Sequence, residues 1–172
     1  SFRVEGEAEH GGDVEHAASS AWIRYGESAT ASFDLNGHAR ILSFSVATLF
    51  ADSLDQKPIP FTELVSLGGD TWMHGYFPGR LVDRSAAVGA VQYTWPVAPF
   101  VDATMQVAVG NVFGEHLDGF DPGLLRLSGA LGLTTPLADP PIELLVGFGT
   151  ETFDHGAQVD SVRVTLGVPR SF

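Results

Sequence analysis

The sequence predicts an all-β protein, an antiparallel transmembrane β-barrel of about eight strands. Apolar and polar residues alternate along several segments, and most clearly in residues 159–172, where one parity collects Val162, Val164, Leu166 and Val168. The opposite parity of these segments is rich in Gly, Ala, Ser and Thr, whereas a water-facing sheet usually carries Lys and Glu. The apolar parity also runs for about five positions, which is near the span of a tilted strand across a hydrocarbon layer.

Composition supports this fold class and excludes others. Twenty glycines and only 17% charged residues are typical of a β-rich chain, and there is no run of about 18 apolar residues that would predict a transmembrane helix. The net charge of −12 argues against nucleic acid as a partner, because phosphates need clusters of Lys and Arg. Without cysteine the chain has neither disulfides nor thiolate sites. Its length predicts one domain over residues 1–172.

The alternation divides the chain into eight expected strands. The second and third strands are separated by Asn36-Gly37, which predicts a tight hairpin turn. The expected strands are at about 2–10, 19–34, 38–50, 85–97, 101–110, 125–134, 142–151 and 159–172.

A long insertion at about 51–84 interrupts this rhythm. It contains three prolines and the aromatic residues Trp72, Tyr76 and Phe77. Loops of this length are usually functional or disordered, and disorder rarely carries so many aromatic residues. We therefore expect the insertion to fold against the rest of the domain.

We expect the charged side chains of the strands to form ion pairs and their aromatic side chains to lie at the membrane interface. Arg126 and Arg163 lie on the parity expected to face the lumen, and we expect them to pair across strands with Glu143, Glu151 or Asp102. The polar lumen residues are thus Asp102, Arg126, Glu143 and Arg163. Four aromatic residues are interpreted as a belt at the membrane interface, namely Trp22, Tyr25, Tyr93 and Trp95.

Gly68-Gly69 is followed in the insertion by Met73-His74-Gly75-Tyr76, and QVAVGNVF stands at 106–113. With these motifs, the insertion and the strands after it resemble the C-terminal part of the BamA-like outer-membrane assembly and secretion superfamily, also called the bacterial surface antigen family. In that family a Gly-Gly stretch precedes a Leu/Val-Arg-Gly-Phe/Tyr motif on a loop that folds back into the barrel. Here Gly68-Gly69 precedes Met73, His74, Gly75 and Tyr76. The segment QVAVGNVF at 106–113, residues 125–133 and the terminal Phe172 are also similar, so the resemblance covers about residues 67–172.

Two positions depart from the family pattern. The motif arginine is replaced by His74, and the aspartate that usually pairs with it falls at Ala108. Losing one partner of a buried ion pair strands a charge, whereas losing both can be nearly neutral. The joint change implies that the usual electrostatic latch of the loop is missing.

The resemblance implies a place in the bacterial outer membrane and a role in inserting or translocating other proteins. The family barrel has about sixteen strands, so this chain is either a small closed barrel or the C-terminal half of a larger one. Two copies pairing through their strand edges are a further alternative. The implied partners are outer-membrane lipid, client outer-membrane proteins and the barrel-assembly machinery. The last strand would carry the recognition signal for that machinery, in Val164, Leu166, Val168 and Phe172.

Two other classes stay open. A small structural or binding barrel would have the same strands without a transport role, and a soluble β-sandwich would bury the apolar parity between two sheets. Neither a catalytic residue, a metal site nor a cofactor is expected. The six histidines lack helical zinc spacing, and no Gly-x-Ser-x-Gly elbow occurs, so we expect no enzyme activity.

Overall fold

The fold is all-β and antiparallel. A computed structural model describes residues 2–12, 21–55, 57–70, 72–135 and 140–168. Eight strands form one sheet in the order β1-β2-β3-β6-β7-β8-β9-β10, and all eight strands predicted from the alternation are confirmed. Their bounds are β1 Phe2–Gly12, β2 Ala21–Asp34, β3 Ile41–Ser53, β6 Ser85–Ala98, β7 Val101–Phe113, β8 Arg126–Thr135, β9 Ile142–Thr152 and β10 Val159–Gly167.

The insertion between β3 and β6 has its own small sheet, which the sequence did not predict. β4 (Val65–Leu67) pairs antiparallel with β5 (Leu81–Asp83), after the short 3₁₀ helix η1 (Phe61–Glu63). Three more 3₁₀ helices lie in the loops after β7 and β9: η2 (Glu115–Leu117), η3 (Pro122–Leu124) and η4 (Phe153–His155). No helix in the described part of the chain is long and apolar enough to cross a membrane.

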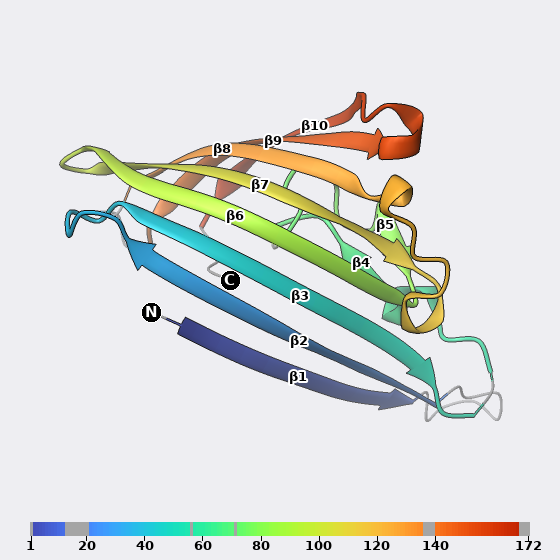
Figure 1. Cartoon of the computed structure of the whole chain (residues 1–172). Coiled ribbons are helices and arrows are strands. Elements are labelled where there is room, and N and C mark those ends of the chain that lie inside the picture. Colours follow the sequence, from blue (N-terminus) through green and yellow to red (C-terminus); the bar gives the residue numbers. More distant parts are fainter. Residues whose placement is uncertain (1, 13–20, 56, 71, 136–139, 169–172) are drawn as a thin grey trace.

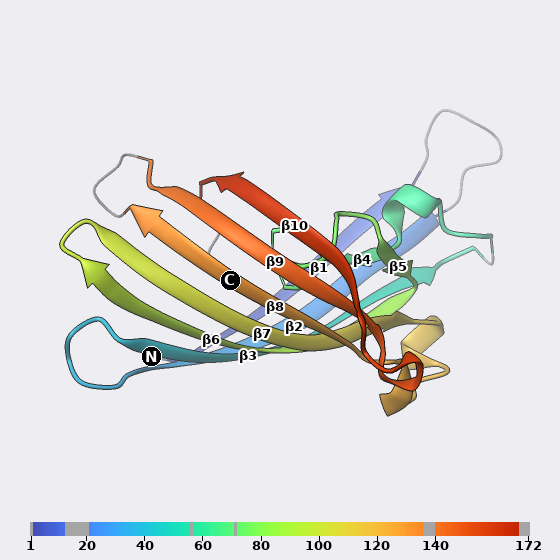
Figure 2. The ribbon, with the colours of Figure 1, turned by 90° about the horizontal axis from the view of Figure 1, so that it is seen from above.

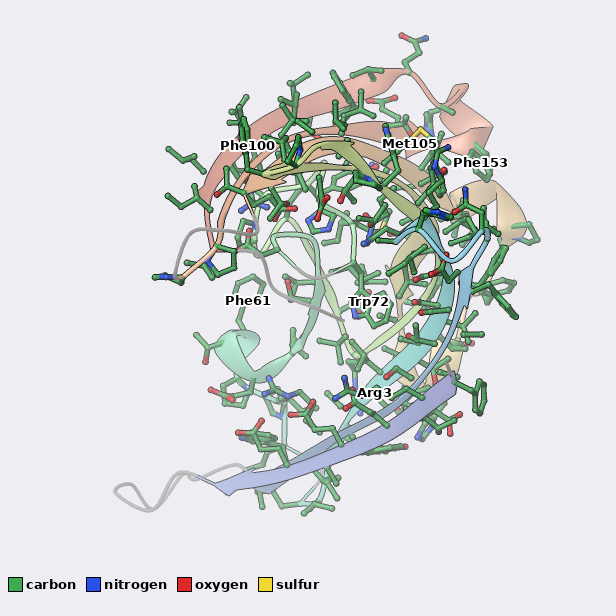
Figure 3. All side chains as sticks on the ribbon, turned by 90° about the vertical axis from the view of Figure 1, so that its left-hand side faces the viewer. Arg3, Phe61, Trp72, Phe100, Met105 and Phe153 are labelled. Carbon is green, nitrogen blue, oxygen red and sulfur yellow. The ribbon has the colours of Figure 1, made fainter. Side chains whose placement is uncertain are left out.

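The main sheet is open within the described residues, with β1 and β10 as its two edges (Figures 1 and 2). β3 and β6 are hydrogen-bonded neighbours despite the insertion between them, and Val46 lies opposite Gly89. A small closed barrel of eight strands is therefore not what the structure contains. The insertion lies on the concave side of the curved sheet (Figure 3).

The two faces of the sheet differ as the alternation predicts. Apolar side chains on the convex face are exposed, for example Val46 (60%), Val107 (45%) and Val164 (66%). Met105 points outward from the sheet, whereas Trp72 of the insertion and Arg3 of β1 lie inside the arc (Figure 3). These valines and leucines do not form the centre of two stacked layers, as they would in a β-sandwich.

The buried core lies between the concave face and the insertion. The sheet contributes mostly alanine side chains and the insertion contributes larger ones. The small side chains on the strands leave space in which the inserted loop packs. The sheet's share is Ala47, Ala51, Ala86, Val88, Ala90 and Ala108; the insertion's share is Val65, Leu67, Met73, Tyr76 and Leu81.

Two local predictions were wrong. Asn36-Gly37 does not form a two-residue turn, because β2 ends at Asp34, β3 begins at Ile41, and the Leu35 amide donates to the Arg40 carbonyl across a wider loop. The Asp34 carboxylate accepts the Gly37 amide and thereby lengthens the turn. Trp22 is not a belt residue: it is only 6% exposed.

Candidate functional site: the loop docked on the concave face

The inserted loop, residues 54–84, reverses direction at Gly68 and Gly69 before it reaches the far strands. Both glycines have positive φ angles, +107° and +81°, which residues with a side chain rarely adopt. The Gly69 amide donates to the Tyr76 carbonyl at 2.8 Å, and the Tyr76 amide donates to the Met73 carbonyl at 3.0 Å. This turn presents residues 73–76 to the sheet.

Gly75 is held by its backbone between two strands. Its amide donates to the Ser128 hydroxyl of β8 at 3.0 Å, and its carbonyl accepts from the Ser161 hydroxyl of β10 at 2.6 Å. A side chain at Gly75 would overlap the backbone of Phe148 in β9. Only glycine therefore allows this approach of the loop to the sheet.

The Tyr76 side chain is fully buried and binds the same strands through its hydroxyl. The hydroxyl oxygen accepts the Thr150 amide at 2.8 Å, and its hydrogen is shared between the Thr150 carbonyl and the Leu127 carbonyl, the latter at 3.1 Å. Burial raises the pKa of the Tyr76 phenol, so the hydroxyl stays protonated and can donate.

Two glycines of β9 form the surface that receives the loop. A Cβ at Gly149 would come within 2.7 Å of the Tyr76 ring, and one at Gly147 would come within 2.5 Å of the His74 carbonyl oxygen. Because real Cβ atoms essentially never approach so closely, both positions require glycine while the loop is docked. The loop and β9 are thus complementary in shape through Gly75, Gly147 and Gly149.

An ion pair adds to the docking contacts. Arg163 of β10 pairs with Asp70 of the loop, and the Arg163 side chain is nearly buried. The predicted cross-strand pairing of Arg163 with Glu143, Glu151 or Asp102 was wrong, because the loop brings a carboxylate closer. The predicted pairing of Arg126 with one of these carboxylates was also wrong, because Arg126 donates to the Thr150 backbone carbonyl at 3.3 Å. The loop therefore has an electrostatic latch, made by residues other than those implied by the resemblance.

His74 lies beside this ion pair in a buried position. Burial lowers the pKa of its imidazole, and the positive charge of Arg163 lowers it further, whereas Asp70 and the backbone at Gly69 act in the opposite direction. His74 and Asp70 share with Glu143 the lining of a cavity of about 410 Å³ between the loop and β9–β10. The imidazole is thus neutral at neutral pH.

The other predicted site residues lie apart from the docked loop. Asp102 is on the concave face near the start of β7 and takes no part in the hydrogen bonds and ion pair described above for the loop. Val164, Leu166 and Val168 of the expected recognition signal are exposed, and the first two lie on the convex face of β10. Phe172 lies outside the described residues.

Three polar residues meet at the other end of β3, and sequence spacing could not have revealed them. Ligand atoms of Asp52, Glu115 and His116 lie within 4.8 Å of one another. Asp52 accepts from the Tyr25 hydroxyl at 3.0 Å and lies 3.0 Å from His116, while Glu115 pairs with Arg84 at 2.8 Å. Carboxylate oxygens and an imidazole nitrogen are ligands that suit a divalent cation. Here, however, the three side chains bind one another, Tyr25 and Arg84, and these contacts hold the β7–β8 loop against the sheet.

Comparisons with known proteins assign no family. The chain matches no protein-family model and no curated protein. The functional interpretation of the docked loop therefore rests on its own contacts and on the faces of the sheet.

Proposed function

We propose that this protein is an outer-membrane β-barrel protein of the BamA-like type, with a role in inserting or translocating other proteins. The observation that carries the proposal is the combination of an exposed apolar convex face with a loop latched to the concave face. A lipid-facing outside and a lumen occupied by a folded-in loop are what the resemblance implies.

The convex face supports the membrane part of the proposal. Its exposed valines, leucines and phenylalanines follow every strand of the sheet, and a contiguous apolar surface of this extent is a liability in water. In lipid the same surface is favourable, while polar groups facing the lumen keep their partners. Representative members of the surface are Phe44, Val46, Val91, Met105, Val107, Leu131, Leu133, Leu144, Val162 and Val164.

The connections support an orientation. Short turns join β2 to β3 and β6 to β7 at one end of the sheet. The two longest described connections, after β3 and after β7, lie at the other end, together with the short connection of β9 to β10 (Figure 1). Outer-membrane barrels have short periplasmic turns and longer extracellular loops. The inserted loop accordingly enters the lumen from the extracellular side.

The proposed activity is physical and needs no covalent chemistry. A seam at the edge strands opens and offers unpaired backbone groups to an incoming strand, which pairs with them as an added strand. The docked loop supports the strands next to that seam, because Gly75 and Asp70 both bind β10. Releasing the loop should therefore weaken the seam and lower activity.

The test compares client insertion in cells that depend on this protein. We expect Gly75→Val, or deletion of residues 66–78, to abolish insertion of outer-membrane clients. Gly129→Val should preserve insertion, because a Cβ at Gly129 meets nothing within 4 Å. Unchanged insertion after loop release would overturn the assembly role. Solubility of the protein in buffer without detergent would overturn the membrane placement.

One observation favours a second function, that of a small-molecule-binding barrel without a transport role. A cavity of about 440 Å³ lies between the loop and β1–β2, with charged and aromatic groups in its wall. Its lining includes Glu7, Glu9, Arg24, Thr62 and Trp72. Insertion that persists in the loop-released variant would favour this function.

A further inference from the structure

The cavity between the inserted loop and β1–β2 has a charged wall and an apolar wall. The sheet contributes the side chains of Glu7, Glu9 and Arg24, and the loop contributes those of Leu64 and Trp72. Trp72 lies inside the arc of the sheet (Figure 3). The volume of about 440 Å³ is within the range of about 300–1,000 Å³ that is typical of small-molecule sites. Such sites combine apolar walls with a few placed polar groups, so the chemistry of the walls indicates what this cavity binds.

One carboxylate in the charged wall has no partner among the described residues. Along β1 the concave side carries a charged residue at every second position, namely Arg3, Glu5, Glu7 and Glu9. Arg3 pairs with Glu5, and Arg24 of β2 pairs with Glu9. Glu7 lies between these two ion pairs, and in the part of the chain that the structure describes its carboxylate forms neither a hydrogen bond nor an ion pair. Because Glu9 and Arg24 neutralise each other, the cavity has one uncompensated negative charge.

The position opposite Glu7 keeps the space beside its carboxylate open. Glu7 is opposite Gly26 of β2, which also lines the cavity. A Cβ at Gly26 would come within 2.5 Å of Leu49 Cδ2 and within 2.8 Å of the Thr48 carbonyl oxygen, so this position requires glycine. The cross-strand neighbour of Glu7 therefore has no side chain that covers the carboxylate.

The apolar wall holds an aromatic ring in a fixed place. Trp72 packs against the buried core, and Val65 of the loop, which also lines the cavity, is only 2% exposed. The docked residues Gly75 and Tyr76 follow Trp72 closely in the loop and attach this part of the loop to the sheet. The face of an indole ring attracts a cation that lies within about 6 Å of its centre. Both walls thus favour positive charge.

Other classes of ligand fit these walls less well. An anion would meet the Glu7 carboxylate, while Arg24 already has a partner in Glu9. A metal ion needs more ligands than Glu7 and Glu9 provide, and the cluster at His116 does not line this cavity. A neutral apolar molecule would displace water from Glu7 without replacing its hydrogen bonds. An organic cation satisfies the carboxylate and the apolar wall together.

We propose that this cavity binds a small organic cation, in which an ammonium group is carried on an apolar body. The ammonium group lies beside the Glu7 carboxylate, and the apolar body packs against Trp72 and Leu64. This inference names the ligand class of the second proposed function and rests on that function. It requires the docked loop, because the loop supplies one wall of the cavity, but it does not require the membrane placement.

Titration calorimetry on the full chain tests the ligand class. The probe is benzyltrimethylammonium, and benzyl alcohol and benzoate are its neutral and anionic counterparts with the same ring. We expect saturable binding of benzyltrimethylammonium at millimolar concentrations and much weaker binding of the other two. Added salt should weaken the binding of the cation, because salt screens its attraction to Glu7. Gly75→Val, which releases the loop, should remove the binding.

Two variants with opposite expected effects test the charged wall. Glu7→Gln should weaken the binding of benzyltrimethylammonium by about fivefold, which is the size of effect expected for a partly screened charge pair. Arg24→Gln should strengthen the binding, because Glu9 then becomes a second uncompensated carboxylate. The Arg24–Glu9 pair is well exposed, so its loss leaves the fold intact. A merely structural role would not give opposite signs at these two positions.

Two further variants test the aromatic wall and control for net charge. Trp72→Leu keeps an apolar side chain and should weaken the binding of the cation by about fivefold, because the ring is lost. Glu27→Gln is the matched control for Glu7→Gln. It removes the same charge from the convex face, opposite Thr48, and should bind the cation as tightly as the native protein does.

Three results would overturn the proposal. Native affinity in Glu7→Gln would mean that this carboxylate does not recognise the ligand. Tighter binding of benzoate or benzyl alcohol that still depends on the docked loop would overturn the cationic class and leave the second proposed function in place. No saturable binding of any of the three compounds, while slow protease cleavage within residues 54–84 shows that the loop is docked, would overturn both. Client insertion and detergent dependence report separately on the proposed membrane role.

Discussion

The inserted loop contacts the two halves of the concave face in different ways. Against β8–β10 it interlocks: the Gly75 peptide, the Tyr76 hydroxyl and Asp70 each bind a strand, and glycines of β9 remove the bulk that would prevent contact. Against β1–β2 it leaves a cavity of about 440 Å³, and the ion pair Arg24–Glu9 at its wall is half exposed.

These unequal contacts indicate where the loop contributes stability. Buried hydrogen bonds that lose one partner leave a desolvated group behind, whereas exposed ion pairs contribute little because water and salt screen them. The loop therefore forms one cooperative unit with the C-terminal strands, while β1 and β2 depend mainly on their backbone ladder with β3. Changes at the two contacts should have unequal effects.

The largest loss of folding stability is expected at Gly75, where the loop approaches β9 most closely. Gly75→Val should destabilise the folded protein by about 3 kcal/mol, because the added side chain cannot coexist with the Phe148 backbone. Denaturant unfolding in detergent micelles measures this free energy, and protease cleavage within residues 54–84 reports release of the loop. Gly129→Val is the control, since its Cβ has open space. Equal losses for the two variants would mean that the loop is not interlocked with β9.

A smaller loss is expected when only the phenol hydroxyl is removed. Tyr76→Phe keeps the ring and leaves the Thr150 amide buried without its acceptor, which should cost about 2 kcal/mol. Tyr93→Phe is the matched control, because Tyr93 lies on the convex face and its contact is ring stacking on Trp95. The same unfolding experiment measures the loss. A Tyr76→Phe variant as stable as Tyr93→Phe would mean that the Tyr76 hydroxyl does not stabilise the docked loop.

Acid should loosen the latch through His74. The pKa of His74 in the folded protein lies below the ordinary 6.5, so the folded state favours the neutral imidazole. The contribution of the neutral imidazole to folding stability is therefore complete above pH 6.5 and is lost as the pH falls through the lowered pKa. Protonation would add a buried positive charge beside Arg163. Protease sensitivity of the loop should therefore rise below pH 6.5 in the native protein. In His74→Gln this rise should be weaker, and an identical pH profile in both proteins would contradict the role of His74.

The smallest effect is expected at the β1–β2 contact. Glu9→Gln should change the free energy of unfolding by no more than about 0.5 kcal/mol, because both partners of the Arg24–Glu9 pair are well exposed. Loop cleavage should remain as slow as in the native protein. A loss as large as that of Tyr76→Phe would erase the contrast between the two halves.

The strands and their faces could be predicted from sequence because side-chain direction has a period of two. Val46, Val107 and Val164 lie on the outer face for that reason alone, and no long-range information was needed. The resemblance indicated that residues 73–76 fold back, and their burial agrees with that expectation.

The partners of the loop could not be predicted. Ser128, Thr150 and Ser161 are ordinary strand residues, and their separation from Gly75 and Tyr76 by 53 to 86 positions leaves no local signal. The pairing of Arg163 was misassigned because no pattern in the sequence places Asp70 within reach of Arg163. β4 and β5 are too short for alternation to reveal them.

In the proposed membrane placement, lipid lies against the apolar convex face. Nitroxide labels on single cysteines along β7, from Thr104 to Val109, test it directly in membranes by their accessibility to oxygen, which concentrates in lipid. We expect high oxygen accessibility at Met105, Val107 and Val109 and low accessibility at Thr104, Gln106 and Ala108, with a period of two. Uniformly low accessibility, with the valines packed against another protein layer, would contradict it.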